Sequence, residues 1–177
     1  MPAAVQTEAQ KNAQSLLSRI SLFISQKEEL KNFKIKAIKK IQVAEDRAAI
    51  VIFVPYRAYF TLNSVRSLVV QEVEKKHANT TVIIIPQRSI VSDKLSRYTN
   101  QIRAHSRTLS AVYDAILNDV VAPSIVVGKR IRYKSDGSSI IKVFLDKNTR
   151  KDVEAKIATF TAVYFALTHR NVEFSFQ

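Results

Sequence analysis

Apolar positions in the first half of the chain follow two spacings, one typical of helices and one typical of strands. Stripes at intervals of three and four residues predict helices, and short apolar runs predict strands. The run from Ala48 to Val54 is apolar on both faces, which indicates a central strand covered on both sides. In order, we expect a helix over residues 8–30 capped by Thr7 with Gln10, strands over 35–44 and 48–54, a helix over 59–77 and a buried strand over 82–85.

The stretch over residues 87–107 breaks this pattern, because its apolar residues are sparse and weakly periodic. Arg and Lys outnumber its one acid, Asp93, and we interpret it as an extended basic loop. Beyond it, Thr108 starts a helical stripe that ends at a proline, and Asp136-Gly137 is a strong hairpin signal. The remaining predictions are a hairpin over residues 128–146, a helix capped by Thr149 and a strand over 172–176.

The halves on either side of the loop share the order helix, strand, strand, helix, strand. Sliding the sequence against itself by 90 residues aligns Lys39 with Lys129 and Ile50 with Ile140. Two hairpins of similar length can agree this well by chance, so the pattern leaves a true repeat open. We expect an α+β fold with helices packed on mixed or antiparallel sheet. It would be a single compact domain over 1–177, with pseudo-halves 8–87 and 108–177 and a basic connector over 88–107.

Composition adds a strong positive charge to this picture. Lys and Arg number 28 against 15 Asp and Glu, a formal net charge of +13. Such a field favours an anionic partner, and nucleic acid is a common one because neutralised phosphates release their counterions. A membrane surface fits less well, since the predicted helices carry core stripes without a cationic polar face. No signal peptide and no apolar run long enough to span a membrane is visible.

The residues provide no constellation for catalysis, a metal or a cofactor. The chain has no Cys, and His77, His105 and His169 lie far apart without the spacing of a metal site. Glu45 and Asp46 form the best carboxylate pair, but they fall in a predicted turn, where Asp is favoured for backbone hydrogen bonding. We therefore predict a protein that is not an enzyme and holds no cofactor. A metal-dependent nuclease using these two acids is the disfavoured alternative.

A row of cations in the second predicted hairpin is one candidate for RNA binding. Arg130, Arg132 and Lys134 alternate with Ile131 and Tyr133, so a strand places the cations on one face and the apolar pair on the other. Phosphates would match such a row of like charges. The alternative is an ordinary solvated sheet face, with Lys and Arg protecting a sheet edge.

The basic loop is the second candidate. Arginine presents a planar fork of donors that suits phosphates, and Tyr98 and His105 could stack on unpaired bases. Nothing in the loop resembles a base-reading code, so recognition would depend on shape and backbone. From both clusters, the candidate RNA-binding residues are Arg88, Lys94, Arg97, Arg103, His105, Arg107, Arg130, Arg132 and Lys134.

Several runs of the sequence resemble one family of ribosomal proteins. The clearest lie in the second half, with others near the first sheet. They are Ser106-Arg107-Thr108-Leu109, Ala111-Val112, Asp114-Ala115-Ile116-Leu117, Gly128-Lys129-Arg130-Ile131-Arg132, Asp136-Gly137-Ser138, Ile52-Phe53-Val54-Pro55 and Gln87-Arg88. Over residues 35–176 the chain is similar to the eukaryote-specific small-subunit ribosomal protein family S-seven, which is unrelated to the bacterial protein of the same number.

The resemblance implies a structural constituent of the 40S subunit that binds 18S ribosomal RNA and supports subunit assembly and translation. It implies a cytoplasmic ribosome with a nucleolar assembly stage, and neighbouring ribosomal proteins that include a small zinc-binding one. No membrane or small-molecule substrate is implied. RNA contact carries over to the matching positions Arg88, Ser106, Arg107, Gly128, Lys129 and Arg130. The connector is less dense in Lys and Arg than the family pattern. An RNA-binding assembly factor that leaves the mature subunit is the alternative.

Overall fold

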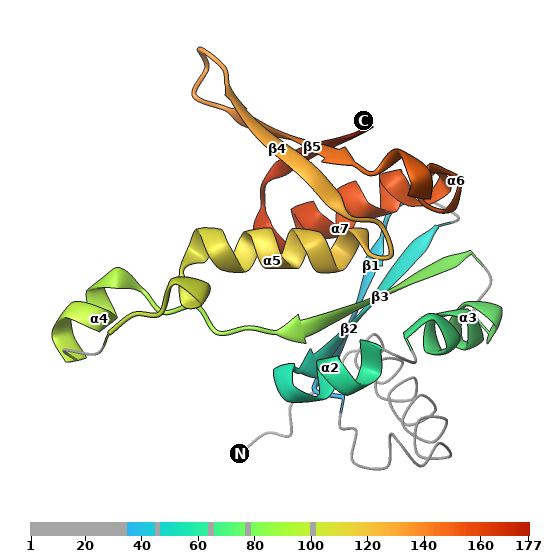
Figure 1. The fold of residues 1–177 in the computed structure, drawn as a ribbon, viewed down its shortest axis with the longest axis horizontal. Coiled ribbons are helices and arrows are strands. Elements are labelled where there is room, and N and C mark those ends of the chain that lie inside the picture. Colours follow the sequence, from blue (N-terminus) through green and yellow to red (C-terminus); the bar gives the residue numbers. More distant parts are fainter. Residues whose placement is uncertain (1–34, 45–46, 64–65, 77–78, 100–101) are drawn as a thin grey trace, which may run out of the picture. The chain divides into compact units, whose positions relative to one another are not determined.

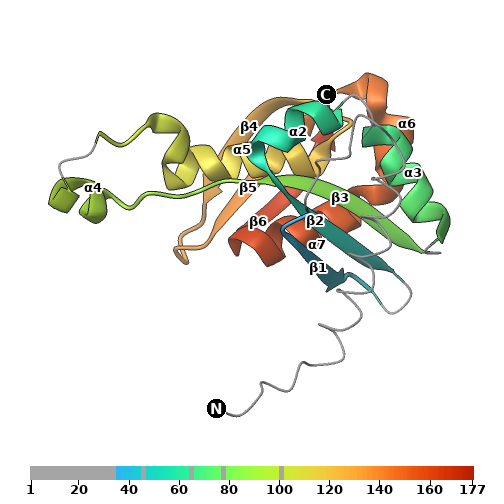
Figure 2. The ribbon, with the colours of Figure 1, turned by 90° about the horizontal axis from the view of Figure 1, so that it is seen from below.

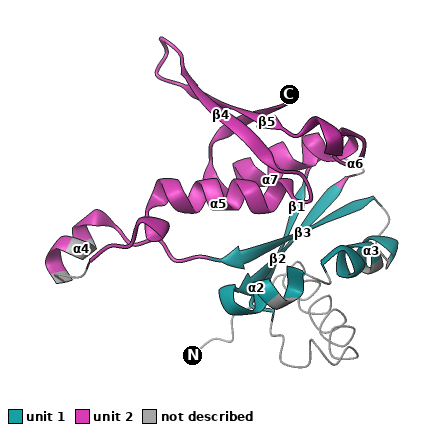
Figure 3. Cartoon of the chain, in the orientation of Figure 1, with its two compact units in different colours: residues 1–42, 48–87 teal, residues 43–47, 88–177 magenta. Residues whose placement is uncertain are grey.

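The computed structural model describes residues 35–44, 47–63, 66–76, 79–99 and 102–177. The chain divides into two compact units, one of residues 1–42 with 48–87 and one of residues 43–47 with 88–177 (Figure 3). The helix expected over residues 8–30 and the pair Glu45 and Asp46 lie outside the described residues. The expectation of a single compact domain stays a prediction.

A three-stranded sheet in the order β1–β2–β3 forms the base of the first unit (Figure 1). β1 (Ala37–Gln42) runs antiparallel to β2 (Ala48–Pro55), which runs parallel to β3 (Thr80–Gln87). The predicted strands are therefore confirmed. Where one helix was expected over 59–77, the structure has α2 (Tyr56–Asn63) and α3 (Arg66–Lys76). α2 begins at Tyr56, three residues earlier than predicted. The prediction missed this start because it followed the apolar stripe, and Tyr56, which is 51% exposed, lies outside that stripe.

One face of this sheet and the two helices share an apolar core. Its members are buried aliphatic residues from β2, α2, α3 and β3, namely Ile50, Ile52, Val54, Leu62, Val69, Val73, Val82 and Ile84. Ala49 and Val51, which alternate with them in β2, are also fully buried. β2 is thus covered on both faces, as its sequence predicted.

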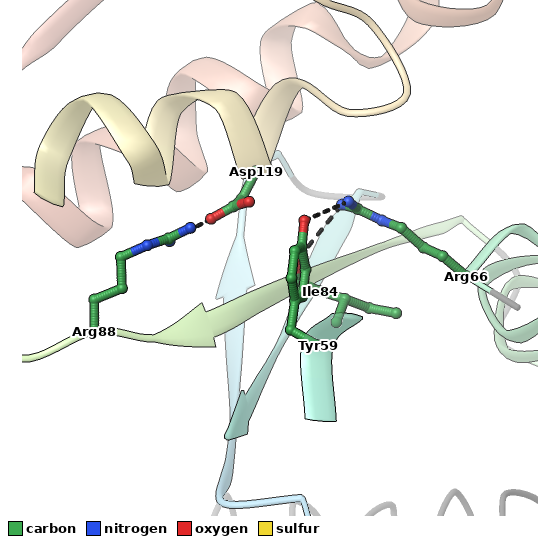
Figure 4. A network of polar contacts seen from close by, with 5 residues as sticks. All are labelled: Tyr59, Arg66, Ile84, Arg88 and Asp119. Atoms are coloured by element: carbon green, nitrogen blue, oxygen red, sulfur yellow. Dashed lines mark hydrogen bonds and ion pairs between the residues drawn. The ribbon is translucent and has the colours of Figure 1, made fainter. Parts of the chain in front are cut away.

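Arg66 links α3 to α2 and β3 in the first unit. Its guanidinium donates to the Tyr59 hydroxyl at 3.1 Å and to the Ile84 carbonyl oxygen at 3.4 Å (Figure 4). The guanidinium carbon also lies 6.0 Å from the centre of the Tyr59 ring. One cation therefore helps hold both helices in place on the sheet.

The second unit has its own three-stranded sheet, in the order β4–β5–β6. α5 and α7 lie on the same side of it (Figure 1), and the ring of Phe160 in α7 meets that of Phe174 in β6 at 6.5 Å. The elements are α5 (Leu109–Val121), β4 (Val126–Tyr133), β5 (Ser139–Leu145), α6 (Arg150–Val153), α7 (Ile157–Thr168) and β6 (Asn171–Phe176). The predicted α5, hairpin and last strand are confirmed.

The helix predicted to start at Thr149 differs from the structure. A 3₁₀ turn over Glu154–Lys156 separates α6 from α7, and Thr149 makes no side-chain capping bond. Its hydroxyl instead donates to the Asp146 carbonyl oxygen at 3.0 Å and meets the Ser124 hydroxyl at 2.7 Å. The side chain is engaged by the preceding turn, so it cannot cap the helix.

The β4–β5 hairpin turns over residues 134–138, at the predicted Asp136-Gly137. The Lys134 amide donates to the Ser138 carbonyl at 2.9 Å, and the Gly137 amide donates to the Lys134 carbonyl at 3.1 Å. Gly137 adopts a φ of 76°, which glycine reaches without strain. The predicted turn is confirmed, together with the reason for its glycine.

The two units repeat the same sheet plan. In each, an antiparallel pair is followed by a parallel pair, and five residues join the first two strands (43–47 and 134–138). The pair Gln42–Ala48 closes the first hairpin and Tyr133–Ser139 the second, so the hairpins correspond at a shift of 91 residues. The expected likeness of the halves is confirmed. The shift of 90 residues used to align the sequence with itself is therefore one residue too small for the two hairpins.

Candidate nucleic-acid interface

The segment after β3 leaves the second unit as an arm. The Val91 amide donates to the Arg107 carbonyl oxygen at 3.0 Å and closes its base. Residues 91–107, here called the basic arm, contain helix α4 (Asp93–Thr99) and a 3₁₀ turn over His105–Arg107. The arm extends away from the rest of the unit (Figures 1 and 2). The expectation of an extended loop is therefore wrong for residues 93–99 and 105–107.

Local charges favour the helical conformation of α4. Asp93 is the acid in its first turn, where a negative charge interacts favourably with the helix dipole. Its carboxylate also accepts a hydrogen bond from Arg97, one turn later, at 2.7 Å. Tyr98 on the same helix is 90% exposed. The prediction missed this helix because it depended on apolar periodicity, and apolar residues are sparse and weakly periodic in this stretch of the sequence.

Asp93 also engages a second arginine of the arm. Its other carboxylate oxygen lies 3.8 Å from Nη1 of Arg103, whose side chain is 22% exposed. Nε of Arg103 is buried and has no hydrogen-bond partner in the part of the chain that the structure describes. Asp93 thus offsets part of the positive charge contributed by Arg97 and Arg103.

The remaining cations of the arm stay open to solvent. Lys94 and Arg107 are exposed and form no ion pair with a described residue. His105 and Ser106 are exposed in the 3₁₀ turn beside Arg107. The arm therefore combines two unpaired charges with an exposed Tyr98 and an exposed imidazole.

Arg88 lies just before the arm and has a different environment. Its guanidinium donates to the carboxylate of Asp119 in α5 (Figure 4), and the two side chains are 17% and 8% exposed. A side chain in such a pair is poorly placed to reach a phosphate. We assign the pair to the stability of the second unit, and RNA contact by Arg88 stays a prediction.

The register of β4 shows which way its cations face. Arg130 lies opposite Lys142 and Arg132 opposite Ile140, and directly opposed residues of an antiparallel pair share a face. Ile131 lies opposite the buried Ile141, on the other face. The predicted alternation is confirmed for Arg130 and Arg132. Lys134 lies one residue past the end of the strand, at the turn.

An aromatic ring supports this cationic face. The Arg130 guanidinium lies 5.3 Å from the centre of the Phe144 ring, and a Cβ at Gly128 would lie 3.6 Å from that ring. Lys142 on the same face forms an ion pair with Glu173 at 3.2 Å. Neither Phe144 nor Lys142 was predicted to contribute. The alternation of β5 could have placed them here, but its two faces are too similarly apolar to be told apart.

Lys129 faces the opposite side from Arg130. Its Nζ donates to Asp114 of α5 at 2.5 Å, and its side chain is 31% exposed. The contact joins β4 to α5, and the carboxylate of Asp114 neutralises the positive charge of Lys129. Among the predicted cations of β4 and the turn that follows it, Arg132 and Lys134 are exposed and form no ion pair with any residue that the structure describes.

The described residues hold no group of three acids or histidines that could bind a metal ion. His169 follows the last residue of α7 as its C-cap, with a φ of 56°. His77 lies outside the described residues. Within the described ranges, no helix is long and apolar enough to cross a membrane.

Comparison with known proteins identifies the family. The model of the ribosomal protein S7e family matches residues 3–176. The chain belongs to the ribosomal protein S7e family. It is 40% identical over 150 residues to the small ribosomal subunit protein eS7 of Dictyostelium discoideum, covering 84% of this chain and 78% of that one. It is 43% identical over 153 residues to eS7 of Anopheles gambiae, covering 85% and 79%.

Plant relatives agree with these matches. The eS7 protein of Secale cereale is 41% identical over 150 residues, covering 85% of this chain and 78% of its own. The resemblance seen in the sequence is therefore confirmed. A small-subunit ribosomal protein has ribosomal RNA and other proteins of the subunit as its partners.

Proposed function

We propose that this S7e protein is a structural constituent of the small (40S) ribosomal subunit. It binds folded 18S ribosomal RNA by shape and backbone contacts and supports subunit assembly and translation without catalysing a reaction. Family membership supports the ribosomal role, and relatives over most of the chain are named as small-subunit proteins. The proposed setting is the cytoplasmic ribosome after a nucleolar assembly stage.

The distribution of charge is the observation that supports RNA binding most directly. Acidic side chains engage Arg88, Arg97 and Lys129, while Lys94, Arg107, Arg132 and Lys134 are exposed and unpaired among the described residues. Unpaired cations on a chain of net charge +13 match a polyphosphate and release its counterions. The primary proposed RNA contacts are therefore the unpaired cations Lys94, Arg107, Arg132 and Lys134. The other proposed contacts are Arg88, Arg97, Arg103, His105, Ser106, Gly128, Lys129 and Arg130, of which several are already engaged within the protein.

Neighbouring ribosomal proteins are the second class of proposed partner. Membership of the family supports contacts within a subunit, and we extend the proposal to a small zinc-binding neighbour. Cross-linking of intact subunits, followed by mass spectrometry, tests this part. We expect cross-links from the exposed lysines of β1, Lys39 and Lys40, or of the second unit to at least one ribosomal protein. If all cross-links join residues of this chain to one another, the proposed contacts with neighbouring ribosomal proteins are wrong.

Sedimentation distinguishes a constituent from an assembly factor. We expect the protein in 40S particles washed with high salt and in translating polysomes. If it occurs in precursor particles and is absent from polysomes, the constituent role is wrong and the assembly factor is supported. A tagged full-length chain and a known core protein of the subunit, followed in the same gradient, provide the comparison.

A further inference from the structure

The end of the β4–β5 hairpin has two unlike faces. Arg130 and Arg132 lie on one face, and Ile131 and Tyr133 lie on the other. The apolar pair is not covered, because Ile131 is 42% and Tyr133 77% exposed. Lys134 follows directly at the turn. A sequence pattern of alternating cations and apolar residues does not predict this exposure of the apolar side.

The exposure of Tyr133 comes from the length of the hairpin. Tyr133 shares its face with Ile141 and Val143, which are 4% and 0% exposed. Lys129 on that face still reaches α5 through Asp114. Beyond Lys129, the side chains of β4 on this face become more exposed, from 42% at Ile131 to 77% at Tyr133. The end of the hairpin projects past the helices that cover the rest of the face (Figure 1).

This projecting end is held in one conformation. The strands pair through Tyr133 and Ser139, and the turn is closed by the hydrogen bonds from the amides of Lys134 and Gly137. The ring of Tyr133 therefore sits on a defined two-stranded ribbon. Binding through Tyr133 therefore costs little backbone ordering, because the ribbon that carries the ring is already formed.

A ribonucleic acid fits this end better than a protein does. A stable protein interface buries about 800 Å² on each side, and its core is depleted in Lys. Two apolar side chains, flanked by Arg132 and Lys134, offer too small an apolar area for the core of such an interface. The deep, narrow major groove of an RNA helix excludes side chains, so bases are reached where the helix is interrupted.

We propose that the hairpin end inserts into an unpaired region of the RNA, such as a bulge, an internal loop or a junction. Tyr133 stacks on an unpaired base, and Arg132 and Lys134 contact the flanking phosphates. Stacking of a base on an aromatic ring tolerates any base, so the site selects RNA shape and not sequence. This inference rests on the proposed RNA-binding function and adds the element that recognises unpaired structure.

Two RNAs test the inference with the full-length chain. One is a perfect duplex, and the other is the same duplex with an internal loop, both measured at one salt concentration. We expect Tyr133→Ala to weaken binding to the looped RNA about ten-fold and to leave the duplex affinity unchanged. Tyr133→Phe keeps the ring and should keep the affinity. Ile125→Ala, which removes another exposed apolar side chain (68% exposed), should change neither affinity.

Fluorescence provides a direct reading of stacking. The chain contains no Trp, so Tyr133→Trp introduces a single indole at the proposed contact. We expect the looped RNA to quench its emission and the duplex to leave it nearly unchanged. Ile125→Trp is the matched control and should respond to neither RNA.

Each contrary outcome has a distinct meaning. Equal weakening of both RNAs by Tyr133→Ala, or equal quenching by both, would overturn insertion while leaving general RNA binding intact. An unchanged affinity for RNA together with poorer incorporation of Tyr133→Ala into 40S particles would assign the hairpin end to a protein neighbour. If the wild-type chain binds neither RNA, the proposed RNA binding fails as well, whereas sedimentation still tests its place in the subunit.

Discussion

Arg88 and Asp119 form an ion pair whose side chains are 17% and 8% exposed, at the point where the basic arm begins. Asp119 lies in α5, so the pair connects the start of the segment leading to the arm with a helix of the second unit. Charges withdrawn from water need partners, because removal of one leaves the other uncompensated. This relationship makes Arg88 a structural residue despite its place among RNA-binding candidates.

Replacing Arg88 should destabilise the protein. We expect Arg88→Ala to lower the free energy of unfolding by up to about 3–5 kcal/mol, because it breaks an ion pair whose Asp119 carboxylate is largely withdrawn from water. Urea denaturation measures the loss. The double variant Arg88→Met with Asp119→Leu should recover much of it, since no buried charge remains. Arg97→Ala, which breaks the exposed pair with Asp93, is the control and should change stability little. Equal midpoints for Arg88→Ala and Arg97→Ala would contradict this assignment.

Unpaired cations should dominate the salt dependence of RNA binding. Removing Lys94, Arg107, Arg132 and Lys134 together should weaken binding and flatten the plot of log affinity against log salt. The slope should fall by up to about one unit for each phosphate that the variant no longer neutralises. Affinities measured over a range of salt concentrations give the slope.

The matched control for that variant carries the same change in net charge. Arg57, Lys75, Lys147 and Lys151 are exposed cations outside the proposed interface, and their joint replacement by Ala removes four charges as well. We expect this control to keep most of the slope. If both variants flatten the slope equally, overall charge and not the proposed residues governs binding.

The sequence predicted the sheets well because their signals are local. Alternation and apolar runs located the described strands, and Asp136-Gly137 located the turn. The α4 helix was missed because its sequence lacks an apolar periodicity, whereas the contact between Asp93 and Arg97, one turn apart, becomes visible only in the structure. The single helix expected over 59–77 was predicted from one apolar stripe, which does not include Tyr56 and therefore missed the start of α2.

The candidate site was predicted only as a set of residue types. Counting cations could not show that Asp119 holds Arg88 and that Asp114 holds Lys129, because those contacts join residues 31 and 15 positions apart. The exposure of Tyr133 was equally hidden, since it depends on how far the hairpin extends beyond its helices. Tertiary contacts decide which members of a basic cluster are available.

Alkaline pH should destabilise the protein in part through Tyr164. Burial raises the pKa of its phenol above the usual value of about 10. The folded state then holds this proton more tightly than the unfolded state, so the contribution is complete below pH ~10 and is lost as pH rises through the folded pKa. The free energy of unfolding should fall more steeply above pH 10 in the wild type than in Tyr164→Phe. Urea midpoints measured from pH 9 to 11 give both slopes, and parallel slopes would contradict the prediction.

The two glycines of the β4–β5 hairpin should respond differently to the same substitution. Gly137 has a φ of 76°, so Gly137→Ala forces an L side chain into the left-handed region and should lower stability by roughly 1–2 kcal/mol. A Cβ at Gly128 would lie 3.6 Å from the Phe144 ring, an ordinary contact, so Gly128→Ala should change stability little. Thermal unfolding of both variants compares them directly. A loss at Gly128 as large as at Gly137 would mean that close packing against Phe144, and not the turn conformation, fixes glycine in this hairpin.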